Sequence, residues 1–140
     1  MLWLRKSKKG FTLIELMVVV AIIGVLALLG LRLYTGQQDK AKNAIVKANV
    51  GTIQTLIQAE LADETVSTVW TYITADTGVP NIYDDAGIHN PFTGTAQTAN
   101  DSVGTTAGAV YVTESGGVFS INGNDADKSP VYAPSLTARK

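Results

Sequence analysis

The sequence predicts an α+β fold in which one long N-terminal helix, about residues 11–63, packs its C-terminal half on a small antiparallel sheet. Apolar residues fill positions 11–31 and then recur at three- and four-residue steps, as expected of a helix. Two short segments with alternating apolar residues follow nearer the C-terminus and flank a glycine-containing turn. A chain of 140 residues has room for one small domain beside such a helix.

The first part of the predicted helix is long and apolar enough to span a membrane. Residues 11–31 contain only two polar side chains, Thr12 and Glu15, and a helix of this length covers roughly 30 Å at ~1.5 Å per residue. A carboxylate inside a membrane span is costly, so we interpret Glu15 as functional. Positive charge resists translocation, so we expect the basic residues before the span to stay cytoplasmic and the remainder to face outward. These basic residues are Arg5, Lys6, Lys8 and Lys9.

The pattern changes from Arg32 onward but stays helical. Charged and amide side chains now occupy the remaining faces, so residues 32–63 are predicted to continue the helix and to lay one stripe against a globular part. An isolated coiled-coil stalk is the alternative, and Gly51 and the lack of sustained heptads argue against it. The predicted stripe consists of Ala41, Ala44, Ile45, Ala48, Ile53, Leu56, Ile57 and Leu61.

The globular part is predicted from shorter signals. Residues 66–73 fit a short amphipathic helix better than a strand, and the turn-rich residues 76–96 predict an ordered surface loop. Residues 109–113 and 118–122 predict a hairpin. A third strand is needed for a stable sheet, and residues 130–137 are the remaining candidate, confined to an edge by their two prolines.

The side-chain inventory indicates a structural protein and not an enzyme. The chain has no cysteine and one histidine, His89, so acyl-transfer and zinc chemistry lack their usual groups, and we expect no cofactor. From Asp63 to Asp127 there are acidic residues but no Lys or Arg. A single subunit is therefore expected to repel nucleic acid.

The N-terminus carries a motif. Gly10 is followed by Phe11-Thr12-Leu13-Ile14-Glu15-Leu16, and residues 8–29 resemble the N-terminus of type IV prepilins and pseudopilins. The resemblance implies that a dedicated peptidase cuts between Gly10 and Phe11, that residues 1–10 are a leader, and that Phe11 becomes N-methylated. Losing the leader would leave a net charge of about −5. A secretory signal or plain anchor is the alternative, but residues 26–31 offer no small-x-small cleavage site after the apolar run.

The resemblance implies that the chain is the major structural subunit of a type IV pilus. Residues 11–31 would form the filament core, and residues 32–140 the amphipathic helix and globular part. Glu15 of one subunit would pair with the Phe11 amine of another. Implied partners are further copies, the prepilin peptidase and an assembly ATPase with its platform protein. The subunit would wait in the cytoplasmic membrane and then reach the cell surface. A major pseudopilin of a type II secretion system, a minor pilin and a tethered enzyme are the alternatives.

The sequence departs from the commonest family pattern in two places. Arg32 stands where a proline is often found, so local flexibility of the apolar helix would rest on Gly24 and Gly30. Many related pilins close a C-terminal loop with a disulfide, which a chain without cysteine closes by other means. We interpret the oxygen-bearing side chains after the second predicted strand as a solvated turn without a metal, and calcium binding there is the alternative. These are Asn122, Asn124, Asp125 and Asp127.

Overall fold

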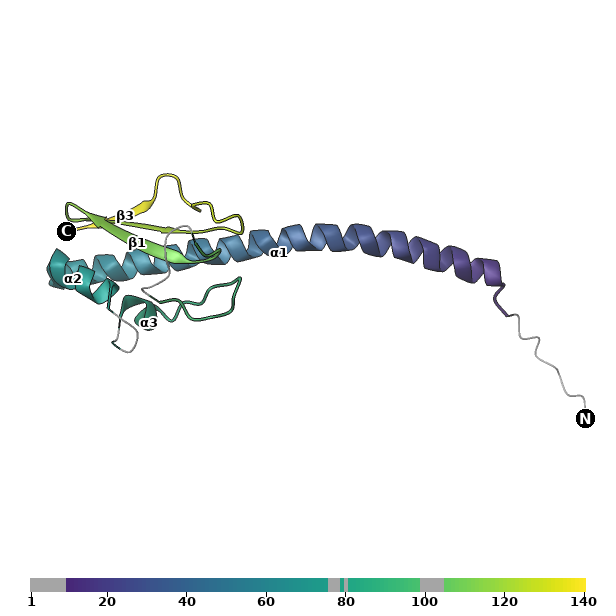
Figure 1. Ribbon diagram of the computed structural model, residues 1–140, viewed down its shortest axis with the longest axis horizontal. Coiled ribbons are helices and arrows are strands. Elements are labelled where there is room, and N and C mark those ends of the chain that lie inside the picture. Colours follow the sequence, from purple (N-terminus) through teal and green to yellow (C-terminus); the bar gives the residue numbers. More distant parts are fainter. Residues whose placement is uncertain (1–9, 76–78, 80, 99–104) are drawn as a thin grey trace, which may run out of the picture. The chain divides into compact units, whose positions relative to one another are not determined.

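The computed structural model describes residues 10–75, 79, 81–98 and 105–140. Within these described residues, three helices precede three strands (Figure 1). The predicted leader, except Gly10, lies outside the described residues. The chain divides into two compact units, Met1–Gln37 and Gln38–Lys140, and we call the second unit the head. The elements are α1 (Leu13–Asp63), α2 (Val66–Ile73), α3 (Ile82–Ala86), β1 (Val110–Ser115), β2 (Val118–Gly123) and β3 (Leu136–Arg139).

Helix α1 confirms the predicted long helix and runs from Leu13 to Asp63 without interruption. Its head portion buries one stripe against the sheet, and every residue of this stripe is at most 1% exposed. The spacing of these residues alternates between three and four positions, which keeps them on one face. The stripe consists of Val46, Val50, Ile53, Ile57 and Leu61.

The first half of the predicted stripe is wrong. Ala41, Ala44, Ile45 and Ala48 are exposed, because two apolar series with helical spacing overlap in this region and periodicity does not choose between them. The sheet packs on the other series, which includes Val46 and Val50. Gly123 at the end of β2 permits this close approach. A Cβ atom at Gly123 would lie 2.5 Å from Val46 Cγ1 and 3.0 Å from Val50 Cγ2.

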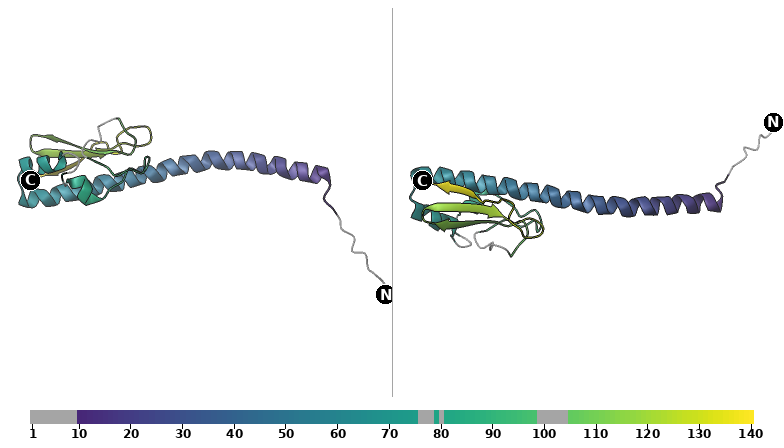
Figure 2. Two further views of the ribbon diagram at one scale, coloured as in Figure 1. Left: turned by 60° about the horizontal axis from the view of Figure 1, so that its bottom comes forward. Right: turned by 90° about the horizontal axis from the view of Figure 1, so that it is seen from above.

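The sheet is antiparallel with the order β1-β2-β3, and it lies along the head portion of α1 (Figure 2). The predicted hairpin is confirmed. Its two-residue turn is Gly116-Gly117, with φ values of 61° and 82° that favour glycine. Phe119 and Ile121 of the central strand are fully buried, and the Phe119 ring lies 6.2 Å from that of Trp70.

The third strand is confirmed at the edge, but it begins later than predicted. Strand β3 starts after Pro134 and includes only the last two residues of the range 130–137. Its outer side is held by α1, because Gln54 Nε2 donates to the Thr137 carbonyl oxygen at 2.9 Å and Gln58 Nε2 donates to that of Arg139 at 3.1 Å. A four-residue helix step (~6 Å) matches a two-residue strand step (~6.6 Å), so the two contacts repeat in register.

The short helix α2 confirms the prediction for residues 66–73. The predicted surface loop over 76–96 is wrong for residues 82–86, which form α3 and bury Ile82 and Tyr83. The Asn81 side chain caps this helix by accepting hydrogen bonds from the backbone N–H groups of Tyr83 and Asp84. Residues 76–78 and 80 of the same prediction lie outside the described part of the chain.

Candidate functional site

The apolar N-terminal part of α1 is exposed throughout in the single chain. Its large apolar side chains, from Phe11 to Tyr34, are 51–91% exposed. A continuous apolar surface of this size is not stable in water, and it marks a surface that a membrane or a partner covers. By length and composition, this part of α1 is sufficient to cross a membrane.

The start of α1 forms a reciprocal cap between Thr12 and Glu15. The Glu15 carboxylate accepts hydrogen bonds from the backbone N–H of Thr12 at 2.9 Å and from its hydroxyl at 2.7 Å. In return, the Glu15 N–H donates to the Thr12 hydroxyl oxygen at 3.3 Å. This is the capping-box arrangement, and it satisfies donors that the first turn of a helix leaves free.

The cap gives the lone carboxylate partners within its own chain. A charge placed in hydrocarbon is costly when it lacks hydrogen bonds, and the two bonds from Thr12 offset part of that cost. Gly10, Phe11, Thr12 and Glu15 line one open hollow. The structure therefore brings the predicted cleavage and assembly residues together.

Sequence reasoning missed the role of Thr12, which it treated only as a polar exception. The signal was present, because a threonine followed three residues later by a glutamate before an apolar run is the signature of a capping box. The predicted flexible glycines, Gly24 and Gly30, lie inside the continuous helix. Nothing lies within 4 Å of a Cβ atom placed at either one, and their flexibility stays a prediction.

The candidate calcium ligands form a hydrogen-bonded turn. The buried Asn122 amide donates to the Tyr132 carbonyl oxygen at 2.8 Å, while its oxygen accepts from the backbone N–H of Gly123 and Tyr132. Asp125 accepts from the N–H groups of Asp127 and Ser129. Asn124 donates to the carbonyl oxygen of Thr106. Among the described residues, no group of three or more His, Cys, Asp or Glu side chains could hold a metal ion. The interpretation as a turn without a metal stays a prediction, and calcium binding stays its alternative.

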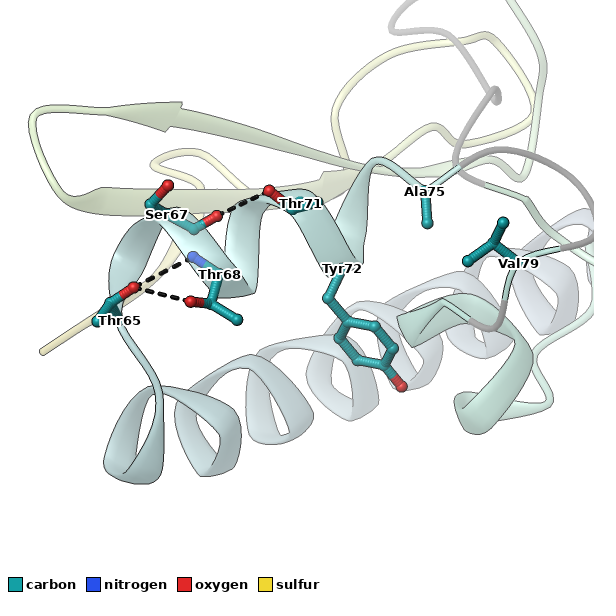
Figure 3. A pocket seen from close by; sticks show the side chains of 7 residues that line it. All are labelled: Thr65, Ser67, Thr68, Thr71, Tyr72, Ala75 and Val79. Atoms are coloured by element: carbon teal, nitrogen blue, oxygen red, sulfur yellow. Dashed lines mark hydrogen bonds between the residues drawn. The ribbon is translucent and has the colours of Figure 1, made fainter.

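A hollow of about 480 Å³ lies beside α2 (Figure 3). Three of its threonine hydroxyl groups are engaged: Thr65 binds Thr68, and Thr71 donates to the Ser67 carbonyl oxygen. Tyr72 donates to Asp85. Burial, then this bond and the nearby charges of Asp85, Glu60 and Asp84, raise the pKa of Tyr72 to about 12. The described lining residues carry no ionised group at neutral pH, so this hollow offers no acid–base pair for catalysis.

His89 lies exposed on the loop after α3, where its Nδ1 is 3.1 Å from the Gly87 carbonyl oxygen. Its own carbonyl oxygen accepts from the Asn49 side chain of α1 at 3.1 Å. The second contact holds the loop against the helix, and it uses the backbone of His89 and not its ring.

The N-terminal residues described above also match a known sequence family. The family of the prokaryotic N-terminal methylation motif matches residues 5–31. The fimbrial protein EcpB of Eikenella corrodens is 45% identical over 63 residues, which are 45% of this chain and 40% of that protein. The type IV major fimbrial protein FimA of Dichelobacter nodosus is 40% identical over 60 residues, 43% of this chain and 38% of that protein. Residues 5–31 thus carry the N-terminal motif of the type IV pilin superfamily.

The chain is also similar to a secretion protein. The type II secretion system core protein G of Pseudomonas aeruginosa is 43% identical over 49 residues, 35% of this chain and 34% of that protein. The chain thus spans about two fifths or less of the length of these pilin-superfamily relatives. No solved structure matches it.

Proposed function

We propose that this chain is the major structural subunit of a type IV pilus and that it acts by assembly and not by catalysis. The observation that carries the proposal is the exposed apolar segment that begins with one capped carboxylate, Glu15. Similarity to a type IV major fimbrial protein supports the same function.

Processing creates the group that Glu15 needs. In this proposal, the prepilin peptidase removes residues 1–10 by cutting between Gly10 and Phe11, and Phe11 becomes the N-methylated N-terminus. The new amine is a positive charge at the edge of the apolar segment. It is buried favourably only beside an opposite charge.

Assembly then pairs charges between copies. Residues 11–31 pack side by side in the filament core, and Glu15 of one copy meets the Phe11 amine of a neighbour. Glu15 exchanges its bonds with Thr12 for this stronger, charge-assisted contact. An assembly ATPase with its platform protein drives the subunit from the cytoplasmic membrane into a surface filament that serves motility, adhesion or DNA uptake.

The substitution Glu15→Val tests this function. In the membrane, it removes a charge that costs about 2.5–3.5 kcal/mol on insertion scales, so the waiting subunit should be cleaved and retained. In the filament, it leaves a neighbour's amine buried without its counter-charge, a loss of roughly 3–5 kcal/mol. Electron microscopy of cells that express only this variant should show few or no filaments, while an immunoblot shows the mature subunit.

Two control variants separate pairing from other effects. Thr12→Val removes the two cap bonds that use the Thr12 hydroxyl but keeps the carboxylate, so it should retain most filaments if pairing is the role of Glu15. Ile22→Val changes the apolar segment without touching either group and should assemble normally. Wild-type numbers of filaments from Glu15→Val, or an equal loss from Thr12→Val, would exclude the pairing role.

A major pseudopilin is the second candidate, favoured by the similarity to core protein G of a type II secretion system. The two functions differ in phenotype. Deleting a pilus subunit removes surface filaments, whereas deleting a pseudopilin leaves secreted enzymes inside the cell envelope. A minor pilin would instead be scarce within the filaments.

A further inference from the structure

Opposite charges gather on two sides of α1 in the head. In Figure 1, β3 lies on one side of this helix and α3 lies on the other. We call Lys40, Lys47 and Arg139 the basic flank, and Glu60, Asp84 and Asp85 the acidic flank.

The contacts of the basic flank place it on the β3 side. The Lys47 ammonium lies 6.0 Å from the ring centroid of Tyr132, shortly before β3. Lys40 is exposed and precedes Lys47 by seven residues, about two helical turns, so both lie on the same side of α1. Arg139 belongs to β3, and Gln58 of α1 donates to its carbonyl oxygen.

The acidic flank surrounds Tyr72 on the other side. Asp85 of α3 accepts the hydrogen bond of the Tyr72 hydroxyl, and Asp84 is its exposed neighbour in the same helix. Glu60 of α1 lines a common hollow with Tyr72 and Val69 of α2. Three carboxylates thus come together from two helices.

Other charged residues lie close to the flanks, but they do not reverse the sign of the net charge on either flank. Lys42 lies on the acidic side, where its ammonium is 5.0 Å from the Phe92 ring centroid. Asp125 and Asp127 lie near the basic side, because the intervening Ala126 N–H donates to Asn43 of α1. Lys140 and Glu64 belong to neither flank, and they lie together just beyond the end of α1, where Lys140 donates to the Glu64 carbonyl oxygen.

We propose that heads of this chain contact one another side by side, with the acidic flank of one copy against the basic flank of the next. The inference rests on the proposed filament. A two-fold contact through either flank would place like charges together, which costs several kcal/mol. An acidic-to-basic contact uses two different surfaces, so each head keeps one flank free for a further copy. Such heterologous contacts generate open helical assemblies when the rotation between copies does not close into a ring.

Charge reversal in the full chain tests the contact. The acidic-flank variant is Glu60→Lys with Asp84→Lys, which leaves the Tyr72–Asp85 bond in place. The basic-flank variant is Lys47→Glu with Arg139→Glu. Each variant alone should lower the filament yield about tenfold or more, because like charges then meet. The variant with all four substitutions restores opposite charges and should recover most of the yield. Thr113→Lys with Ser115→Lys, both exposed on β1, controls for added charge and should assemble normally.

Cross-linking reports the geometry directly, because the chain has no cysteine of its own. A chain with Lys47→Cys and Asp84→Cys, treated in filaments with a short bis-maleimide, should give a ladder of covalent multimers. Either cysteine alone should give monomers. Dimers from one cysteine alone would reveal a two-fold contact and overturn the proposal.

The outcomes separate this inference from the proposed function. All variants are compared in cells where the wild-type chain forms filaments and where blots show equal amounts of mature subunit. Normal filaments from both flank variants, or failure of the four-substitution variant to recover, would overturn the side-by-side contact alone. Absence of filaments from the wild-type chain would instead contradict the proposed pilus function.

Discussion

Gly123 lies where the end of β2 comes nearest to α1. A Cβ atom at this position would be 2.5 Å from Val46 and 3.0 Å from Val50, both of which are fully buried. Side chains this tightly packed cannot move aside without cost. A single missing side chain therefore sets how closely the sheet approaches the helix.

We predict that Gly123→Ala destabilises the head by about 1–3 kcal/mol, the usual cost of overpacking a core. Gly51→Ala is the matched control, because nothing lies within 4 Å of its added Cβ and the residue is helical. That change should stabilise the protein by about 0.5–1 kcal/mol. Chemical denaturation of the detergent-solubilised protein measures both, and equal effects would contradict the close approach.

Tyr72 gives the head a pH dependence at high pH. Its pKa of about 12 lies above the ordinary tyrosine value of 10.0, so the folded state favours the neutral phenol. The stabilisation is complete below pH 10 and is lost as the pH rises through about 12, because the unfolded chain releases this proton first. Tyr72→Phe should therefore lose less stability than the wild type between these pH values. The free energy of unfolding, measured against pH by chemical denaturation, checks this. Parallel curves for the two proteins would contradict the raised pKa of Tyr72.

At the scale of elements, local signals predicted most of the fold. The apolar run and the helical spacing after it predicted α1, and two adjacent glycines between alternating segments predicted the hairpin of β1 and β2. Helix α3 was missed because its two cap residues, Asn81 and Gly87, are also turn formers, and because its burial depends on tertiary contacts. The inner face of α1 was half wrong, since only the sheet decides between two overlapping stripes.

We predict that Gln54→Ala with Gln58→Ala loosens β3 selectively. Each substitution removes a hydrogen bond to the strand, and a typical bond contributes about 0.5–1.5 kcal/mol. Hydrogen exchange should speed up over Leu136–Arg139, while β1 keeps its protection. Gln37→Ala, in the N-terminal unit and exposed, is the control. Uniform acceleration across the sheet would show that β3 is not held separately.

At the scale of the whole molecule, the head has a hydrophobic core, whereas the N-terminal unit exposes its apolar side chains. The head has its own core, shared by α1, α2, α3 and the sheet. The candidate site was predictable in part, because a lone carboxylate in an apolar segment is visible in the sequence. Its proposed partner, the Phe11 amine, belongs to another copy after cleavage, so one chain cannot display the pair.

We predict that a chain shortened to begin at Tyr34 is soluble and folded. The shortening removes most of the exposed apolar surface and leaves the core of Gln38–Lys140 whole. Circular dichroism should show a cooperative thermal transition, and size-exclusion chromatography a single small species. Aggregation under all conditions, or a spectrum of disordered chain, would show that the head needs the N-terminal segment to fold.

Mass spectrometry of filaments sheared from cells tests the central claim most directly. It reports the abundance of the subunit and the chemistry of its N-terminus in one sample. We predict that this chain is the dominant protein, that it begins at Phe11, and that Phe11 carries one added methyl group. A chain that is absent from the sheared filaments, or that retains residues 1–10 within them, would contradict the account.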